Sequence, residues 1–219
     1  MTDRAAQADL FEKQASQPLP EGIWHRPGLF DPLFQADLAH AVAEIARQAP
    51  FTHPRMKGKG VFSASITNSG AAGWWSDERG YRYEPTQPGT TTPWPAMPPI
   101  FSEAVRRATD GTPWPRFASD ACLINFYGPG AKMGLHQDKD ERDFSQPIVT
   151  VSLGDAADFL IGGAKRADPS RVLRVESGDA MLMGPPSRML FHGVRKVFAG
   201  TSPIAGLAGR YSLTFRKAL

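Results

Sequence analysis

His136 and Asp138 are the residues whose types and spacing first suggest chemistry in this sequence. They stand two positions apart, and side chains two apart in an extended segment point to one face, so the imidazole and the carboxylate converge while Gln137 turns away. This arrangement is half of a metal site. A His-x-Asp pair that runs into the charged stretch 138–141 (DKDE) also fits a solvated surface loop, and the pair alone does not separate the two interpretations.

A second histidine downstream favours the metal site. His192 lies in the apolar stretch 189–194 (MLFHGV), where a lone histidine is usually a satisfied core residue. Two histidines and one carboxylate form the 2-His-1-carboxylate triad of non-haem iron(II) oxygenases, which leaves coordination positions open. The sequence therefore predicts His136, Asp138 and His192 as iron(II) ligands and as the catalytic centre.

The stretch 210–216 (RYSLTFR) alternates cleanly, as a strand does. One face is apolar, and the other carries Arg210, Ser212, Thr214 and Arg216. At about 3.3 Å per residue the two arginine Cα atoms are roughly 20 Å apart, so their side chains can lean together and grip the two ends of one small dianion. The alternative is a half-exposed edge strand whose arginines extend into water.

Together these residues closely resemble the AlkB family, the iron(II)- and 2-oxoglutarate-dependent dioxygenases that repair alkylated nucleic-acid bases. The resemblance rests on the three predicted ligands, on the RxSxTxR pattern of 210–216, and on the stretches 121–127 (ACLINFY) and 147–154 (PIVTVSLG). It runs from about Phe51 to Arg216, and residues 1 to about 20 add little to it.

The resemblance implies that 2-oxoglutarate and oxygen are cosubstrates. Asn125 and Tyr127, two apart on one strand face, match family residues that contact 2-oxoglutarate. Arg210 matches the arginine that pairs with its distal carboxylate, and Arg216 matches the one near its iron-bound end. Ser212 departs from the asparagine that the family carries there, so a hydrogen bond behind the cosubstrate is expected to differ.

The resemblance also implies oxidative demethylation of bases of the 1-methyladenine or 3-methylcytosine type in DNA or RNA, with release of formaldehyde. Their methyl group lies on the Watson–Crick edge, so the substrate must be single-stranded or must have its base flipped out. Four residues match the family's substrate-contacting positions, namely Trp74, Tyr81, Asp140 and Arg166. Trp74 is expected to stack on the base opposite His136, whereas Trp75 and Trp94 are expected to pack in the interior.

Other interpretations stay open. Asp140 and Arg166 also fit ordinary solvated charges. An oxygenase with the same iron and 2-oxoglutarate can hydroxylate a small molecule or a protein side chain instead of a base. A metal-binding or sensory jelly roll without turnover is a third possibility, although a simple metal site has no use for two arginines that grip a dianion.

The composition fits one soluble domain. A chain of 219 residues with 41% hydrophobic and 10% aromatic residues is long enough to bury about 70% of its unfolded surface. We expect a cytoplasmic monomer without membrane contact, because no apolar run approaches the length of a membrane span and no secretory signal is evident. The single cysteine, Cys122, excludes an internal disulfide and is expected to be a buried structural thiol. The net charge of +3 gives a mild preference for polyanions.

The elements that must position these residues are two helices and many strands. Asp31 is predicted to cap a helix that begins at Pro32 and ends near Ala49, and a second helix is predicted from about Met97 to Asp110. The predicted strands are 121–127, 148–153, 159–161, 172–175, 180–183, 189–192 and 211–216. This is a mainly β fold with flanking helices, and it matches the double-stranded β-helix, or jelly roll, that the family uses.

We expect a tail at residues 1–20 and a single dioxygenase domain at 21–219. Within it, the segment 51–99 is rich in glycine, proline and aromatic residues, with basic residues at Arg55, Lys57, Lys59, Arg79 and Arg82. Aromatic and cationic side chains suit stacking on bases and contact with phosphates, although they equally suit a well-packed loop. The resemblance assigns this segment to the family's nucleotide-recognition lid, and Ile66 and residues 55–59 are where substrate preference is expected to be set.

Overall fold

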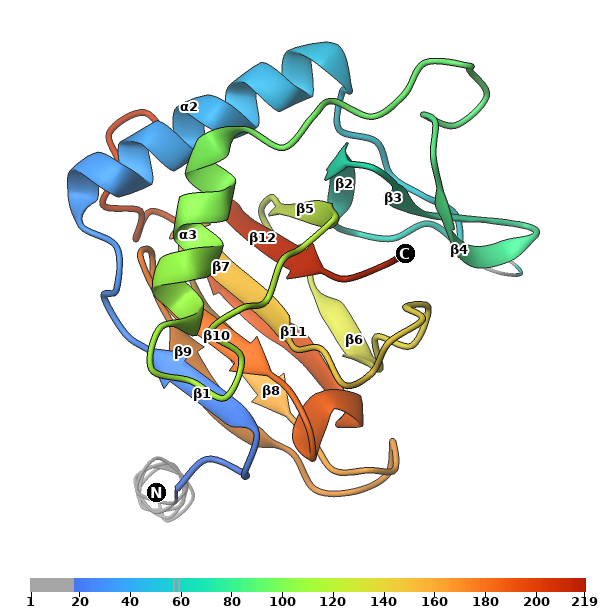
Figure 1. Cartoon of the computed structure of the whole chain (residues 1–219). Coiled ribbons are helices and arrows are strands. Elements are labelled where there is room, and N and C mark those ends of the chain that lie inside the picture. The colour runs from blue at the N-terminus through green and yellow to red at the C-terminus, as the bar shows by residue number, and fades with distance from the viewer. Residues whose placement is uncertain (1–17, 57, 59) are drawn as a thin grey trace, which may run out of the picture.

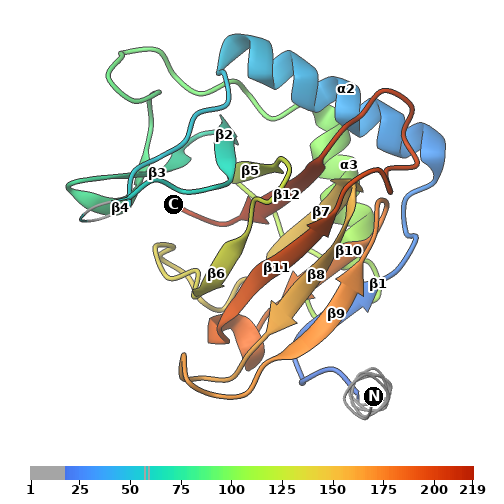
Figure 2. The same cartoon turned by 180° about the vertical axis from the view of Figure 1, so that it is seen from behind.

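Two antiparallel sheets face each other in the computed structural model, which describes residues 18–56, 58 and 60–219 (Figure 1). In spatial order the larger sheet consists of β1 (Ile23–Arg26), β10 (Ala180–Met183), β7 (Ile148–Gly154), β12 (Arg210–Arg216), β5 (Ala121–Tyr127) and β2 (Ser65–Gly70). The smaller sheet, nearest the viewer in Figure 2, consists of β6 (Met133–His136), β11 (His192–Phe198), β8 (Ala156–Ile161) and β9 (Arg171–Val175). A separate hairpin of β3 (Gly73–Asp77) and β4 (Gly80–Glu84) lies beside β2. The predicted jelly roll is confirmed.

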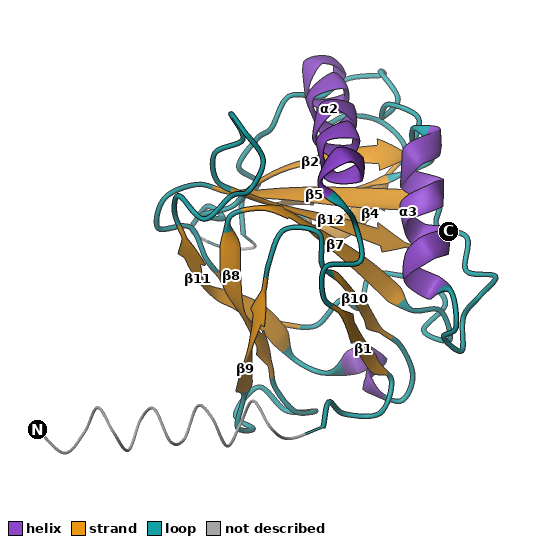
Figure 3. Cartoon of the chain, turned by 90° about the vertical axis from the view of Figure 1, so that its left-hand side faces the viewer, coloured by secondary structure: helices purple, strands orange, loops and turns teal. Residues whose placement is uncertain are grey.

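Both predicted helices are present, on the outer face of the larger sheet (Figure 3). Helix α2 (Pro32–Gln48) begins where expected, because the Asp31 side chain accepts a hydrogen bond of 3.0 Å from the backbone N–H of Phe34. Helix α3 (Pro99–Thr109) begins two residues later than predicted, since Pro98 keeps an extended backbone and a residue that precedes a proline disfavours the helical region. In the described part of the chain, no helix is long and apolar enough to cross a membrane.

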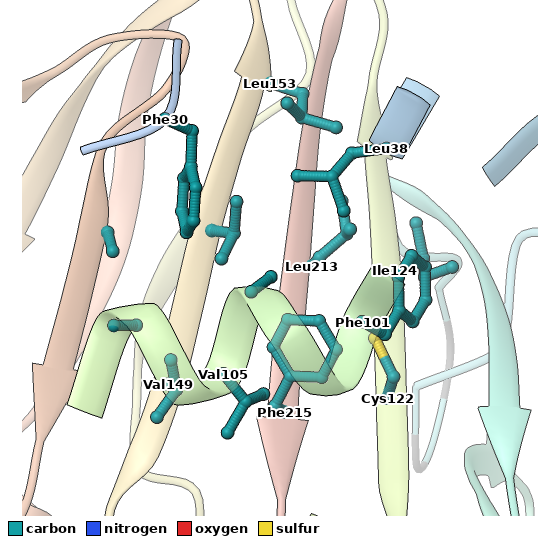
Figure 4. Packing of buried hydrophobic residues seen from close by; sticks show 14 of the residues in the cluster. Phe30, Leu38, Phe101, Val105, Cys122, Ile124, Val149, Leu153, Leu213 and Phe215 are labelled. Atoms are coloured by element: carbon teal, nitrogen blue, oxygen red, sulfur yellow. The ribbon is translucent and has the colours of Figure 1, made fainter. Parts of the chain in front are cut away.

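The main hydrophobic core lies between these helices and the outer face of the larger sheet (Figure 4). Phe101 of α3 meets Phe215 of β12 edge to face, with ring centroids 5.3 Å apart. Cys122 is fully buried in the same cluster, and burial raises the pKa of its thiol, so the prediction of a structural thiol is confirmed. β12 pairs with β5 on one side and β7 on the other, which makes it a central strand and excludes the half-exposed edge strand.

Several local predictions differ from the structure. The strand predicted at 189–192 is wrong, because Leu190 N–H closes a short 3-10 turn (η1, Ser187–Met189) onto the carbonyl of Ser187, and β11 begins only at His192. The strand predicted at 159–161 already begins at Ala156. The strands β1, β2, β3, β4 and β6 were not predicted. For β2 (SITNSG) the reason is that a polar strand buried on both faces carries no alternation of apolar and polar residues.

Asp179 joins the N-terminal strand β1 to the turn between β9 and β10. Its carboxylate accepts hydrogen bonds from His25 Nε2 (3.0 Å), Gly28 N (2.8 Å) and Glu176 N (2.9 Å). Burial raises the pKa of Asp179, but the hydrogen bonds from His25 and from the two backbone N–H groups lower it by more. The net pKa is below the ordinary value of 3.8. The ionised carboxylate therefore stabilises the folded chain.

We expect Asp179→Ala to lower the free energy of unfolding at pH 7 by about 1–3 kcal/mol. Because the folded-state pKa is depressed, this stabilisation is present above the unfolded pKa of 3.8 and is lost as the pH falls through the folded value. Urea unfolding of the unmutated and variant proteins between pH 7 and pH 3 checks this. A difference that stays constant over that range would assign the effect to packing rather than to charge.

Candidate active site

The inner face of the larger sheet is polar at the centre of the sheet. On β12, Arg210 stands opposite Tyr127 of β5, and Ser212 stands opposite Asn125 of β5 and Ser152 of β7. Directly opposite residues of antiparallel strands point to the same face. All five side chains are buried. The residues predicted to contact a cosubstrate are thus brought together on one face, which is turned toward the smaller sheet.

The predicted metal ligands also come together. Strands β6 and β11 pair so that His136 and His192 are direct partners. The Nδ1 atom of His136 is 2.9 Å from the carbonyl oxygen of Gly134, and that of His192 is 3.1 Å from the carbonyl of Leu190. A carbonyl only accepts, so Nδ1 carries the proton in each ring and Nε2 is left as a metal donor.

Asp138 supplies the third donor. Its carboxylate oxygens lie 3.8 Å from His136 Nε2 and 3.4 Å from His192 Nε2, and the ligand atoms of the three residues all lie within 4.8 Å of one another. Asp138 follows the end of β6 and is therefore not in the same strand as His136, although the spacing of the pair suggested one extended segment. Gln137 does turn away, since its amide donates to the carbonyl of Met189 at 2.7 Å.

The charges of this cluster suit a divalent metal. Desolvation, followed by the proximity of His192, lowers the pKa of His136 to about 4, so its ring is neutral at pH 7, as a ligand must be. Burial raises the pKa of Asp138, but the guanidinium of Arg216 and the ring of His192 hold it well below its usual range. Neutral imidazole together with ionised carboxylate is the donor set that iron(II) oxygenases use.

Arg210 is a buried cation without a counter-ion among the described residues. It is 1% exposed, its Nη2 donates to Ser152 Oγ at 3.0 Å, and its Nε has no hydrogen-bond partner in the same part of the chain. Burial lowers its pKa to about 10, so the guanidinium stays charged at pH 7. A buried charge without a partner is costly. The arrangement fits an anionic ligand such as the distal carboxylate of a small dicarboxylate.

Arg216, at the other end of the polar face, lies against the metal ligands. Its Nη2 pairs with Asp138 Oδ1 at 3.0 Å, and its Nη1 lies 3.2 Å both from Glu141 Oε1 and from the hydroxyl of Tyr83. Arg188 in turn pairs with Glu141 Oε2 at 2.9 Å. Glu141, Arg188 and Tyr83 were not predicted from the sequence, because a glutamate in a charged run and a tyrosine in an aromatic segment carry no distinguishing spacing.

The residues predicted to contact a base lie on the hairpin, on the loop after β6 and, for Arg166, on the loop between β8 and β9. Trp74 Nε1 donates to Asp140 Oδ2 at 2.8 Å, and the Trp74 ring stacks on Tyr81 with centroids 5.6 Å apart. Arg166 donates to the carbonyl of Leu135, the residue before His136. All four predicted residues, Trp74, Tyr81, Asp140 and Arg166, therefore contact one another or the segment that carries the ligands.

Two further residues fix the hairpin. The Asn68 side chain bonds both the backbone N–H and the carbonyl of Trp74, at 3.0 and 3.1 Å, and was not singled out from the sequence. Trp94 is 7% exposed, and its Nε1 donates to the carbonyl of Glu84 at 2.9 Å, so its predicted packing role is confirmed. Trp75 is half-buried on the opposite face of the hairpin from Trp74.

The basic residues of the segment 51–99 are less available for phosphates than expected. Arg82 pairs with Asp77 at 2.8 Å and with Glu84, and Arg79 pairs with Asp77 at 3.2 Å. These ion pairs lie within the hairpin and stabilise it. Arg55 lies 3.9 Å from Glu78 with both side chains exposed, while Lys57 and Lys59 lie outside the described residues.

Gly193 sets the distance between the two strands that carry the histidines. A Cβ at this position would lie 2.5 Å from the carbonyl oxygen of Met133 and 3.0 Å from that of Gly134, both backbone atoms of β6. We expect Gly193→Ala to push β6 from β11 and to weaken metal binding by about 10–100-fold, measured by calorimetric titration with Mn(II). Gly134→Ala is the control, because a Cβ there meets nothing within 4 Å. Equal affinity in the two variants would show that strand spacing does not position the ligands.

Comparison with known proteins places this geometry in context. Residues 23–216 match the family model described as the 2OG-Fe(II) oxygenase superfamily. The alpha-ketoglutarate-dependent dioxygenase AlkB of Escherichia coli is 45% identical over 181 residues, which cover 83% of each chain. The DNA N(6)-methyladenine demethylase ALKBH1C of Arabidopsis thaliana is 36% identical over 168 residues, which cover 65% of this chain and 37% of that protein.

A solved structure agrees with the fold. The structure of OsALKBH1 superimposes with a TM-score of 0.78 at 30% sequence identity, covering 91% of this chain and all of the other. The similarity therefore extends over most of the chain.

Proposed function

Because the chain belongs to the AlkB family of the 2OG-Fe(II) oxygenase superfamily, and is thus an iron(II)- and 2-oxoglutarate-dependent dioxygenase, we propose that it demethylates alkylated bases in nucleic acid. The substrates proposed are 1-methyladenine and 3-methylcytosine, with direct reversal of the damage as the outcome. The related Arabidopsis protein, described as a DNA demethylase, supports a methylated base as the class of substrate.

The observation that carries the proposal is the combination of three groups, two between the sheets and one on the adjoining hairpin. Two histidines and a carboxylate have their donor atoms within 4.8 Å. A buried arginine, with no counter-ion among the described residues, lies on the facing strand β12. An aromatic pair, Trp74 and Tyr81, lies on the hairpin. Trp74 donates a hydrogen bond to Asp140, which is two residues after the predicted metal ligand Asp138.

Each cosubstrate residue has a proposed role. His136, Asp138 and His192 hold iron(II) through Nε2 of each ring and the carboxylate. Arg210 binds the distal carboxylate of 2-oxoglutarate with Ser152 beside it, and Arg216 faces the end next to the metal. Asn125 and Ser212 line the same face between the two arginines, and Tyr127 stands beside Arg210.

The base side is proposed in the same way. The segment 51–99 forms a lid, and Trp74 stacks on a base that is flipped out or already single-stranded. Asp140 accepts a hydrogen bond from Trp74 Nε1 and has a second oxygen to accept one from an exocyclic amine. Arg166 lies beside the segment that carries His136 and contacts the nucleic acid.

The protein's part in the reaction is to bind, orient and exclude water. When bound, iron(II) with 2-oxoglutarate and oxygen supplies the oxidation of the N-methyl carbon, which leaves as formaldehyde while 2-oxoglutarate is converted to succinate and carbon dioxide. The two arginines fix the direction of the dicarboxylate, and the bonds from Nδ1 to backbone carbonyls orient both imidazoles so that Nε2 points inward. The aromatic pair holds the base so that its methyl group faces the metal.

The test is mass spectrometry of a single-stranded oligonucleotide that carries 1-methyladenine, incubated with protein, iron(II), ascorbate and 2-oxoglutarate. Loss of one methylene mass that requires 2-oxoglutarate and is absent with His136→Ala is the expected result. If 2-oxoglutarate is consumed while the oligonucleotide mass stays unchanged, the oxygenase chemistry holds and the substrate is a different adduct, a small molecule or a protein side chain.

A further inference from the structure

Tyr83 extends from the hairpin into the charge network of the metal site. Its hydroxyl donates to Glu141 Oε1 at 2.6 Å and accepts from Arg216 Nη1 at 3.2 Å. Arg216 Nη1 also donates to Glu141 Oε1 at 3.2 Å, so the three groups close a ring. From this ring, Arg216 Nη2 continues to the metal ligand Asp138 at 3.0 Å. A residue of the hairpin is thus one side chain away from a metal ligand.

The same hairpin face carries the aromatic residues proposed to hold the base. Tyr83 on β4 is the direct partner of Trp74 on β3, so their side chains point to one face. Tyr81, two residues before Tyr83, lies on this face as well and stacks on Trp74. A shift of the hairpin would therefore move the aromatic pair and the Tyr83 hydroxyl together.

The hairpin depends on such contacts for its position. It is a two-stranded sheet that pairs with neither large sheet, and an isolated two-stranded hairpin is only marginally stable. Asn68 holds β3 and Trp94 holds the end of β4, both from the side of β2. Tyr83 contacts β12 through Arg216.

Glu141 is a fixed partner for the tyrosine. Arg188, itself 3% exposed, pairs with Glu141 Oε2 at 2.9 Å and donates to the backbone carbonyl of Asp138 at 2.7 Å. Glu141 therefore keeps its position whether or not Tyr83 is present. Removing either member of this buried ion pair would leave an unpaired charge. Removing the tyrosine hydroxyl leaves the ion pair intact and disturbs the fold less.

We propose that Tyr83 is a positioning residue that couples the docking of the β3–β4 hairpin against Arg216 to the binding of 2-oxoglutarate at Arg216. A docked hairpin fixes the position of Arg216 through the hydrogen bonds among Tyr83, Glu141 and Arg216. A bound cosubstrate also fixes Arg216 and thereby stabilises the docked hairpin. The two effects are reciprocal, because coupling between two binding events has one free energy. The inference rests on the roles proposed above for Arg216 and for the lid.

Two measurements without nucleic acid test the coupling, with Tyr83→Phe compared against Tyr211→Phe, which removes a hydroxyl from the opposite face of β12. Calorimetry with Mn(II) and 2-oxoglutarate should give a dissociation constant about 3–10-fold higher for Tyr83→Phe and unchanged for Tyr211→Phe. Hydrogen exchange should slow in residues 73–84 of the unmutated protein when Mn(II) and 2-oxoglutarate are added. This protection should be lost in Tyr83→Phe and kept in Tyr211→Phe.

The proposal is overturned if Tyr83→Phe binds 2-oxoglutarate as tightly as the unmutated protein and keeps the exchange protection. It is equally overturned if cosubstrate gives no protection of the hairpin in the unmutated protein. A purely structural role would lower the melting temperature and leave both readouts unchanged. Because no nucleic acid is present, a wrong assignment of the methylated base would not alter either result.

Discussion

Replacement of Arg210 by methionine is expected to weaken 2-oxoglutarate binding strongly and, at the same time, to stabilise the free protein. The guanidinium is buried with no counter-ion among the described residues, so the folded protein carries the cost of its desolvation until a carboxylate arrives. Methionine fills a similar volume without charge, and such replacements of buried ions can be stabilising by about 1–4 kcal/mol. The affinity for 2-oxoglutarate should fall by at least about 100-fold, since a desolvated, bidentate charge pair is lost.

Thermal unfolding and calorimetry with Mn(II) and 2-oxoglutarate measure the two effects separately. Arg210→Lys is the matched variant, because it keeps the charge and loses the fork of donors, and it should bind weakly without the gain in stability. An Arg210→Met protein that melts at a lower temperature and still binds 2-oxoglutarate would show that this side chain is structural. The expected combination is unusual in that a loss of function accompanies a gain in stability.

Replacement of His192 by alanine is expected to eliminate turnover. The variant leaves two donors, and the metal affinity should fall by at least about 100-fold, as the loss of even an outer-shell partner typically costs 10–100-fold. His40→Ala on the exposed surface of α2 is the control for the removal of an imidazole. Mn(II) titration together with 2-oxoglutarate consumption measures the loss, and full consumption by His192→Ala would remove this residue from the metal site.

The part of the fold that the sequence predicts well is the part with local signals. Asp31 and Pro32 specify the start of α2 because a cap and a first-turn proline act within a few residues. The alternation of 210–216 likewise predicts the strand β12. It does not predict that the strand is central in its sheet, since this depends on β5 and β7, which are distant in sequence.

The candidate site divides in the same way. The His-x-Asp spacing, the second histidine and the paired arginines indicate a metal and a dianion, and the resemblance to AlkB identifies them as iron(II) and 2-oxoglutarate. Glu141 looked like part of a solvated run and is 5% exposed, because Arg188, Arg216 and Tyr83 converge on it from three separate segments. Such partners are set by tertiary structure and leave no pattern in the sequence.

The lid segment shows the same limit. Arg82 looked free to contact phosphates, and instead it pairs with Asp77 and Glu84 within the hairpin. Asp77, five positions before Arg82, becomes its partner only when β3 and β4 turn back on each other, while Glu84 lies two positions along the same strand. The charge count of the segment therefore overstated the cations that a nucleic acid could meet.

Some expectations stay predictions. A tail is expected at residues 1–20, and residues 1–17 of it lie outside the described residues. The monomeric state, the cytoplasmic location and the limits of the lid also stay predictions.

The central position of β12 has a consequence for how the enzyme becomes active during synthesis. Both arginines of the polar face lie on this strand, which follows every other described strand in the chain and must insert between β5 and β7. A nascent chain that still lacks β12 therefore has its metal donors but neither arginine, and its larger sheet has an open middle. Such late, long-range strand pairing is slow. If both arginines bind the cosubstrate as proposed, insertion of this last strand, rather than collapse of the earlier ones, determines when the cosubstrate can first be bound.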